Sequence, residues 1–344
     1  MKERIVRGIA AAASAAVLGV AVPAQAQTAI AVNSWVGATH LVTVDLLGGW
    51  MKEIEKASNG RLAPKMLTKA VTAPPGTFDA VRDGLADVSV ILHGMQPARF
   101  VLPKAAEFPQ LGRTGEINSA AYQRIHEKHF ARVDEHKGVR VLAVFTHGPG
   151  NILTTKKPVN RLEDVAGLKF RVGGGFLGDL LKSLGAVPIV RSGSESYELL
   201  SGGIVDATAL PYETIVTFNL DRVVKHLTVV PGGLYNLTWA VIMNEDKFKS
   251  LPKQDQDVIN AWSGERLARH SGRSWDNKDR QAYEIVQKGP IQSVTADRAF
   301  VSSLLERSRA FEEEWVKEAK QKGVDGALVM KDLRAEIAKI TDAR

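Results

Sequence analysis

Short apolar runs alternate with segments of helical spacing in the first part of the chain. The runs at 29–33, 62–67 and 86–92 predict buried strands, and the segments at 41–54 and 76–84 predict helices between them. The apolar positions of the first helix are Leu41, Val44, Leu47, Met51 and Ile54. A strand, helix, strand order of this kind predicts an α/β fold with a largely parallel sheet covered on both faces.

The same alternation resumes near residue 139. It predicts strands at 139–145, 152–155, 169–172 and 187–190, and helices at 176–184 and 194–202. Two sheets of similar construction are therefore expected. Ligands of open α/β sheets bind at the carboxyl ends of strands, so the loops after these strands are the first place to search for a site.

The last third of the chain is predicted to be mostly helical. One or two long helices should end at Gly289-Pro290, and a further helix carries an aromatic and aliphatic stripe. The stripe consists of Phe300, Leu304, Phe311 and Trp315. Aromatic stripes at helical spacing are usually core, and these are expected to be buried.

The N-terminus has the pattern of a secretory signal. Basic residues precede an apolar, alanine-rich run, and Ala24-Gln25-Ala26 matches a cleavage site, so residues 1–26 are predicted to be removed on export. The chain has no cysteine, so an exported protein cannot rely on disulfides. The roughly 318 residues that remain exceed the usual size of one core, which predicts two lobes.

Charge and motif content narrow the possible functions. The net charge is +7, but lysines and arginines are scattered rather than clustered, which argues against a nucleic-acid partner. Neither a Gly-x-Ser-x-Gly motif nor a cysteine nucleophile is present, which disfavours an enzyme. His126 and His129 lie on a charged helix without a further ligand nearby, so no metal or cofactor is expected and both side chains are predicted to be solvated.

Arg171 is the strongest candidate for ligand binding. It lies at the end of the strand predicted at 169–172 and is followed by Gly173-Gly174-Gly175. A guanidinium keeps its charge and can bind both oxygens of a carboxylate, while the three glycines would let a ligand approach. The alternative is a surface ion pair with a nearby Asp or Glu.

Four ordered motifs give the chain a family resemblance. They are the opening strand, loop and helix that ends in Ser58-Asn59-Gly60-Arg61-Leu62, then residues 78–88 with Phe108-Pro109-Gln110-Leu111, then 158–172, and finally 199–207. In this order, from Thr28 to about Arg309, the chain resembles the substrate-binding proteins of tripartite ATP-independent periplasmic (TRAP) transporters. The resemblance places the protein in the periplasm.

The resemblance implies a two-lobed periplasmic binding protein fold with a hinge cleft and a long bracing helix. Lobe I would comprise 27–148 with a returning strand near 235–247, lobe II would comprise 149–232, and 248–344 would form the long helix and C-terminal helices. It further implies that Arg171 holds the carboxylate of a small organic acid, and that the partners are integral-membrane transporter subunits.

Two positions depart from the family pattern. Where many members that bind sugar acids carry a second arginine, this chain has Asn151, and where members direct Asn or Glu towards the ligand, it has Leu210. Both differences remove charge or polarity from the inferred site. A monocarboxylate with an apolar or aromatic body is therefore expected, and a metal-bridged carboxylate is not.

Further ligand contacts are expected from loops and from a strand that crosses between the lobes. The candidates are Trp35, His40, His93, Phe176, Tyr212, Asn236 and Trp239. Aromatic rings could stack on a ligand, and imidazole, phenol or amide groups could form hydrogen bonds with it. Two other functions stay open: a binding protein of an ATP-driven importer, and a periplasmic enzyme.

Overall fold

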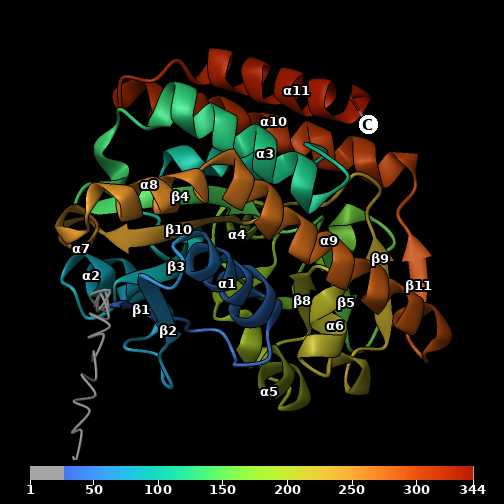
Figure 1. Cartoon of the computed structure of the whole chain (residues 1–344). Helices are drawn as coiled ribbons and strands as arrows, with labels where there is room; N and C mark the ends of the chain where they lie inside the picture. Colours follow the sequence, from blue (N-terminus) through green and yellow to red (C-terminus); the bar gives the residue numbers. More distant parts are fainter. Residues whose placement is uncertain (1–26, 344) are drawn as a thin grey trace, which may run out of the picture.

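Two sheets form the centres of two lobes in a computed structural model that describes residues 27–343 (Figure 1). The predicted signal peptide, 1–26, lies outside these residues. Lobe I is built on the sheet ordered β2-β1-β3-β10-β4. Its strands are β1 (Thr28–Asn33), β2 (Leu62–Met66), β3 (Val88–Leu92), β4 (Val139–Thr146) and β10 (Thr238–Asn244).

Lobe II is built on the sheet ordered β11-β9-β5-β8-β6-β7. Its strands are β5 (Asn151–Thr154), β6 (Lys169–Val172), β7 (Val187–Val190), β8 (Ala207–Leu210), β9 (His226–Val229) and β11 (Gln292–Thr295). Neither β9 nor β11 was predicted, and the two strands pair in parallel. One strand in each sheet, β10 or β5, is antiparallel to its neighbours, and each follows a crossing between the lobes.

Helices cover both faces of the two sheets. In lobe I these are α1 (Gly48–Ala57), α2 (Thr77–Arg82), α3 (Gly115–Ile125), α7 (Glu245–Ser250) and α8 (Lys253–Ala261). In lobe II they are α4 (Phe176–Ser183), α5 (Ser196–Ser201) and α6 (Glu213–Thr217). Short 3-10 segments include Pro74–Gly76, His93–Met95, Leu102–Glu107, Asp134–His136, Leu162–Val165, Gly193–Glu195 and Leu220–Arg222. None of the helices in the described part of the chain is long and apolar enough to span a membrane.

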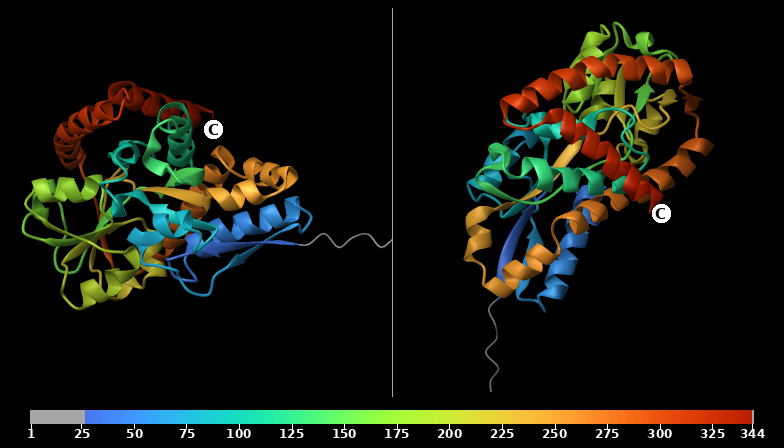
Figure 2. Two further views of the ribbon diagram at one scale, coloured as in Figure 1. Left: turned by 90° about the vertical axis from the view of Figure 1, so that its left-hand side faces the viewer. Right: turned by 90° about the horizontal axis from the view of Figure 1, so that it is seen from above.

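Three longer helices follow, and the first two of them connect the lobes. They are α9 (Glu265–Lys288), α10 (Arg298–Gln321) and α11 (Gly326–Asp342). Helix α9 contacts α3 and β4 of lobe I and α6 of lobe II, and α10 contacts the Leu102–Glu107 segment of lobe I and α4 of lobe II. Figure 2 shows α10 and α11 arching over both lobes. The expected α/β class and two-lobed fold with a bracing helix are thus confirmed.

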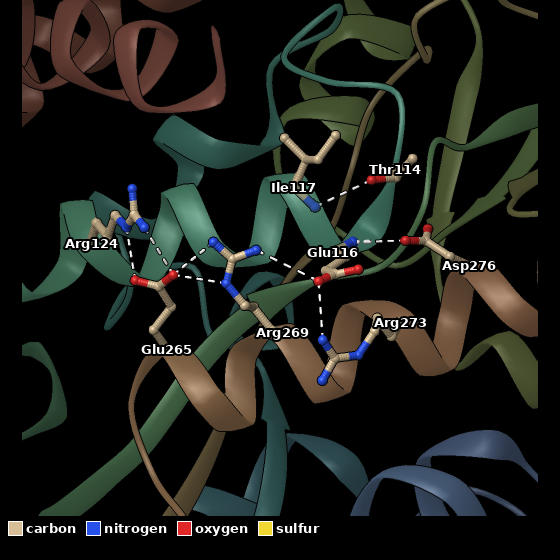
Figure 3. A network of polar contacts seen from close by, with 8 residues as sticks. All are labelled: Thr114, Glu116, Ile117, Arg124, Glu265, Arg269, Arg273 and Asp276. Carbon is tan, nitrogen blue, oxygen red and sulfur yellow. Dashed lines mark hydrogen bonds and ion pairs between the residues drawn. The ribbon is translucent and has the colours of Figure 1, made fainter. Parts of the chain in front are cut away.

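A ladder of ion pairs fastens α9 to α3 (Figure 3). Arg124 of α3 binds Glu265 at the start of α9 at 2.8 Å, and Arg269 binds the same carboxylate at 2.7 Å. Arg273, one turn further along α9, contacts Glu116 of α3 at 3.1 Å. The ladder is partly exposed except at Glu116, which is buried, so the exposed pairs are expected to add little stability.

Several predicted details differ in the structure. The first helix begins with a π-helical segment, Val42–Leu47, and Val44 is 51% exposed rather than part of the core face. A π turn holds more residues than an α turn, so it shifts the face on which later residues lie.

His126 is buried rather than solvated, and His129 is half-buried and contacts Asp332 at 2.7 Å.

The predicted aromatic stripe of α10 is largely internal. Phe300, Leu304 and Trp315 are buried, and Phe311 is half-buried against the core. The indole N–H of Trp315 donates to the carbonyl of Val101 in lobe I at 3.0 Å. The stripe therefore holds the bridging helix against both lobes, because Phe311 also packs on Phe176 of lobe II with ring centroids 5.9 Å apart.

Candidate functional site

A small, partly open cavity of about 50 Å³ lies between the lobes. Residues of both lobes and one residue of α9 surround it. They are Trp35, Val36, His40, Leu92, His147, Arg171, Gly193, Ser194, Leu210, Pro211, Glu213, Thr214, Phe218, Leu237, Trp239 and Trp275. On this scale one water needs roughly 10 to 15 Å³, so the cavity as it stands has room for a few waters.

Arg171 lines the cavity and is 2% exposed. Its Nε and Nη2 donate to the carbonyl of Arg191 at 3.0 and 2.7 Å, while Nη1 is buried without a hydrogen bond. The Arg191 carbonyl uses one hydrogen each of Nε and Nη2, which leaves three guanidinium hydrogens on Nη1 and Nη2. Burial lowers the pKa of Arg171 to about 10, so the group is still a cation at neutral pH. The surface ion-pair interpretation is wrong because this cation is internal.

Aromatic rings form much of the remaining wall. Trp35 and Trp239 are stacked with ring centroids 5.5 Å apart and an interplanar angle of 6°. Trp275 of α9 lies 5.7 Å from Trp239. The Trp35 indole N–H donates to the carbonyl of Val90 at 2.8 Å, whereas the indole N–H groups of Trp239 and Trp275 have no hydrogen bond. The wall is thus apolar but presents two unused donors.

A buried acid and imidazole face each other at the same cavity. Glu213, at the start of α6, is 2% exposed, and its Oε1 lies 3.6 Å from Nε2 of His40. The Nδ1 atom of His40 accepts from the backbone N–H of Val42 at 3.1 Å. The His40 ring also stacks on Phe218 at 5.5 Å. The site therefore contains one carboxylate in addition to the cationic Arg171.

His147 has a structural role in this region. Its Nδ1 hydrogen-bonds to the carbonyl of Gly148, and its Nε2 accepts from the backbone N–H of Leu237 at 3.0 Å. Burial lowers the pKa of His147 to about 4. The ring is therefore neutral at pH 7, with both nitrogens already used.

Half of the predicted site residues lie together around the cavity. Arg171, Trp35, His40, Leu210 and Trp239 all line it. Asn151 does not, although it pairs with Leu210 between β5 and β8; its Oδ1 accepts from the N–H of Val230 at 3.4 Å. Tyr212 lies outside the cavity lining and packs edge-on against Tyr283 at 5.4 Å.

Three further candidates are also outside the lining. The Nε2 atom of His93 lies 3.0 Å from Nε2 of His136, inside lobe I. Phe176 packs on Phe108 with ring centroids 5.1 Å apart. Asn236 is 3% exposed, and its side-chain oxygen has no hydrogen bond in the described structure. Because the rings of His93 and Phe176 pack against other side chains, their positions give no support to a contact with a ligand.

The triple glycine allows close contact between the lobes. A Cβ atom on Gly174 would overlap the backbone of Gly94, and one on Gly175 would overlap the carboxylate of Glu107; both glycines have positive φ. The Oε2 atom of Glu107 accepts from the backbone N–H of Phe176 at 2.9 Å. Gly174 and Gly175 therefore have a packing role, whereas a Cβ atom on Gly173 would lie 3.8 Å from Nη2 of Arg171, and the expectation that a ligand approaches Arg171 past these glycines stays a prediction.

Several lining residues were missed by the sequence interpretation. They include Glu213, Phe218, His147, Gly193 and Trp275. His147, Gly193 and Glu213 closely follow β4, β7 and β8, so a systematic search of loops after strands would have included them, whereas Phe218 follows α6. Trp275 lies within a helix, where its spacing is that of a core residue, and no local pattern distinguishes it.

Comparison with known proteins gives a consistent result. Residues 34–318 match the family model described as bacterial extracellular solute-binding protein, family 7. A curated relative, the outer membrane transporter protein TsaT of Comamonas testosteroni, is 28% identical over 96% of this chain and 98% of its own length.

Solved structures agree in fold and in class. A TRAP periplasmic solute-binding protein of Bordetella bronchiseptica, with bound (R)- and (S)-mandelate, is 46% identical, with a TM-score of 0.89 over 91% of this chain and 99% of that chain. A marine metagenome TRAP protein specific for aromatic acid ligands, in complex with metahydroxyphenylacetate, is 27% identical, with a TM-score of 0.84 over 91% and 99% of the two chains. The chain belongs to family 7 of the bacterial extracellular solute-binding proteins, the solute-binding proteins of TRAP transporters.

Proposed function

We propose that this chain is an extracytoplasmic receptor that binds an aromatic monocarboxylate through Arg171 and delivers it to integral-membrane TRAP subunits. The observation that carries the proposal is a buried guanidinium with an unused Nη1, lining a cavity walled by tryptophans. A buried cation without a counter-ion is costly, and a ligand carboxylate would neutralise it. The predicted export signal and the family suit a periplasmic location.

The shape and polarity of the site support a single aromatic ring. The stacked pair Trp35 and Trp239 offers flat apolar surface, and Leu210 adds no polar group. A dicarboxylate would place its second charge near Glu213, which is itself a carboxylate. The mandelate and metahydroxyphenylacetate seen in the two similar proteins are both aromatic monocarboxylates.

Lobe closure would account for how residues of both lobes meet the ligand. Arg171 and Leu210 belong to lobe II, and Trp35 and Trp239 belong to lobe I. A ligand that contacts both groups binds the closed form better and shifts the hinge equilibrium towards it. The closed form would then present the composite surface that membrane subunits recognise.

A melting screen of organic acids tests this function. Ligands that bind only the folded protein raise its melting temperature, so mandelate, phenylacetate and benzoate should raise it, and succinate and glucuronate should not. Stabilisation by dicarboxylates or sugar acids alone would refute the proposed ligand class. Ligand recovered chemically unchanged after long incubation would argue against an enzyme, and turnover would establish one.

A further inference from the structure

Four of the residues that line the cavity each carry a buried polar atom without a hydrogen bond. Three are donors: Arg171 Nη1, Trp239 Nε1 and Trp275 Nε1. The fourth, Glu213 Oε1, is an acceptor. Buried polar groups normally have hydrogen-bond partners, so these unpaired atoms indicate which hydrogen-bonding groups a ligand in the cavity should carry. A ligand carboxylate could accept hydrogen bonds from the three donors, but it has no hydrogen to donate to Glu213 Oε1.

Glu213 Oε1 accepts no hydrogen bond, although it lies within ion-pair distance of His40. The other oxygen, Oε2, accepts from the hydroxyl of Thr217 at 2.8 Å, within the same helix. Nε2 of His40 is 3.6 Å from Oε1, which is longer than a hydrogen bond. The backbone N–H of Glu213 donates to Asp279 Oδ1 at 2.8 Å, which holds this residue in place.

The other polar side chains of the lining are already engaged. The hydroxyl of Ser194 pairs with that of Ser192 at 2.9 Å, and the hydroxyl of Thr214 donates to the carbonyl of Pro211 at 2.6 Å. Both ring nitrogens of His147 are used. Among the lining side chains of the described structure, Glu213 is therefore the acceptor available to a ligand.

A ligand carboxylate bound at Arg171 would be repelled by Glu213, so a different part of the ligand must face this oxygen. We propose that Glu213 accepts a hydrogen bond from a hydroxyl group of the ligand, and that the receptor thereby selects hydroxylated aromatic monocarboxylates over their unhydroxylated analogues. This inference rests on the proposed function and adds the residue that sets its specificity. A site built to bind a hydroxyl rejects the analogue without one, because its buried acceptor then stays unpaired.

Isothermal titration with matched ligands tests the inference on the wild-type chain, starting at residue 27 and freed of copurified ligand. Phenylacetate is compared with mandelate, which adds an α-hydroxyl, and with 3-hydroxyphenylacetate, which adds a ring hydroxyl. The corresponding methoxy compounds keep an oxygen but cannot donate. We expect at least one hydroxy acid to bind roughly 10-fold or more tightly than both phenylacetate and its own methyl ether.

Substitution of Glu213 should remove the preference. In Glu213→Met the ratio of affinities for the hydroxy acid and phenylacetate should fall to near one, while phenylacetate binds at least as well as before. Glu195→Met is the matched control, because it removes a carboxylate that is half-exposed and near Arg171 but outside the cavity lining. Its ratio should equal that of the wild type.

The outcomes separate the two proposals. If no aromatic acid binds the wild type, the proposed function fails. If aromatic acids bind but neither hydroxyl improves affinity over phenylacetate and the methyl ethers, the role of Glu213 is refuted while the receptor function stands. The ligand comparison needs only the wild type, so it decides the matter even if Glu213→Met does not fold.

Discussion

Asp276 and Asp279 lie one turn apart on α9, and each accepts hydrogen bonds from the start of a helix in a different lobe. Asp276 accepts from the backbone N–H groups of Gly115 and Glu116 at 2.6 and 3.0 Å, at the start of α3 in lobe I. Asp279 accepts from the N–H of Glu213 at 2.8 Å, at the start of α6 in lobe II. One helix thus fixes both lobes, and Asp279 directly positions a residue of the cavity.

The Asp279 carboxyl should make stability depend on pH. Burial raises its pKa well above the usual value of 3.8, and the N–H of Glu213 opposes this only in part. The folded state therefore holds the proton more tightly than the unfolded chain, so this group's contribution to stability falls as the pH rises from about 3.8 through the folded pKa. Asp279→Asn keeps an acceptor but has no carboxyl proton. As the pH rises over this range, the free energy of unfolding of the variant should therefore increase relative to that of the wild type.

Urea unfolding at a series of pH values measures this effect. Asp179→Asn, a change of the same type at a side chain that is 53% exposed, is the control and should show no such trend. A constant difference between Asp279→Asn and wild type at every pH would contradict the assignment.

Buried histidines should make the protein sensitive to acid. Burial lowers the pKa of His93 to about 3 and that of His126 to about 4, and it also lowers the pKa of His136 well below 6.5. The unfolded chain takes up protons that the folded state cannot, so stability should fall as the pH drops below about 6.5, by up to ~1.4 kcal/mol per pH unit for each such group. His126→Phe should reduce this slope in urea unfolding between pH 6.5 and 5, and an unchanged slope would exclude His126 as a contributor.

Glu107 should be important for stability because it links the lobes. Its Oε1 accepts from the hydroxyl of Thr238 at 2.8 Å, and its Oε2 accepts from the N–H of Phe176 at 2.9 Å. Glu107→Ala leaves these donors buried without partners and should lower the free energy of unfolding by about 2 to 4 kcal/mol. Gly175→Ala, at φ +69° and against the same carboxylate, should also destabilise. Denaturant melts within 0.5 kcal/mol of wild type for both variants would contradict this role.

Gly193 should control access to the guanidinium. A Cβ atom at this position would lie 3.2 Å from the Phe218 ring and 3.6 Å from Nη2 of Arg171. Gly193→Val should therefore fill the space beside Arg171 and weaken binding of an aromatic acid by roughly 10-fold or more. The measurement is calorimetric titration, with Gly178→Val in α4 of lobe II as a control for lobe stability, because a Cβ atom there would lie no closer than 3.8 Å to Val172 and φ is not positive. Equal affinity in Gly193→Val and wild type would show that the ligand binds elsewhere.

The sequence predicts the elements well where one physical signal dominates. The strands at 169–172 and 187–190 are found with the expected bounds, because short apolar runs there end at glycine or polar residues. Val44 was misplaced because a period of 3.6 residues does not describe a π turn. β11 was missed because its residues are mostly exposed and polar, so it has no apolar run.

The site was predictable only in part. Arg171 and Leu210 follow from strand ends and from the family pattern, and both line the cavity. Trp275 depends on the packing of α9 between the lobes, which no local pattern contains. Glu213 immediately follows Tyr212, which was chosen instead because a phenol at a loop suggested a ligand contact; only the fold shows which of the two points inward.

The most direct test of the account is the affinity of Arg171→Ala for the best aromatic acid, measured by calorimetric titration beside Arg191→Ala. Arg191 is an exposed arginine whose backbone carbonyl, kept in the variant, holds Arg171. Losing one partner of a buried ion pair costs about 3 to 5 kcal/mol, so Arg171→Ala should bind the acid at least roughly 100-fold more weakly than wild type. The unliganded Arg171→Ala protein should still melt as a single cooperative unit. Arg191→Ala should bind the acid like wild type. Undiminished affinity in Arg171→Ala would contradict the central claim.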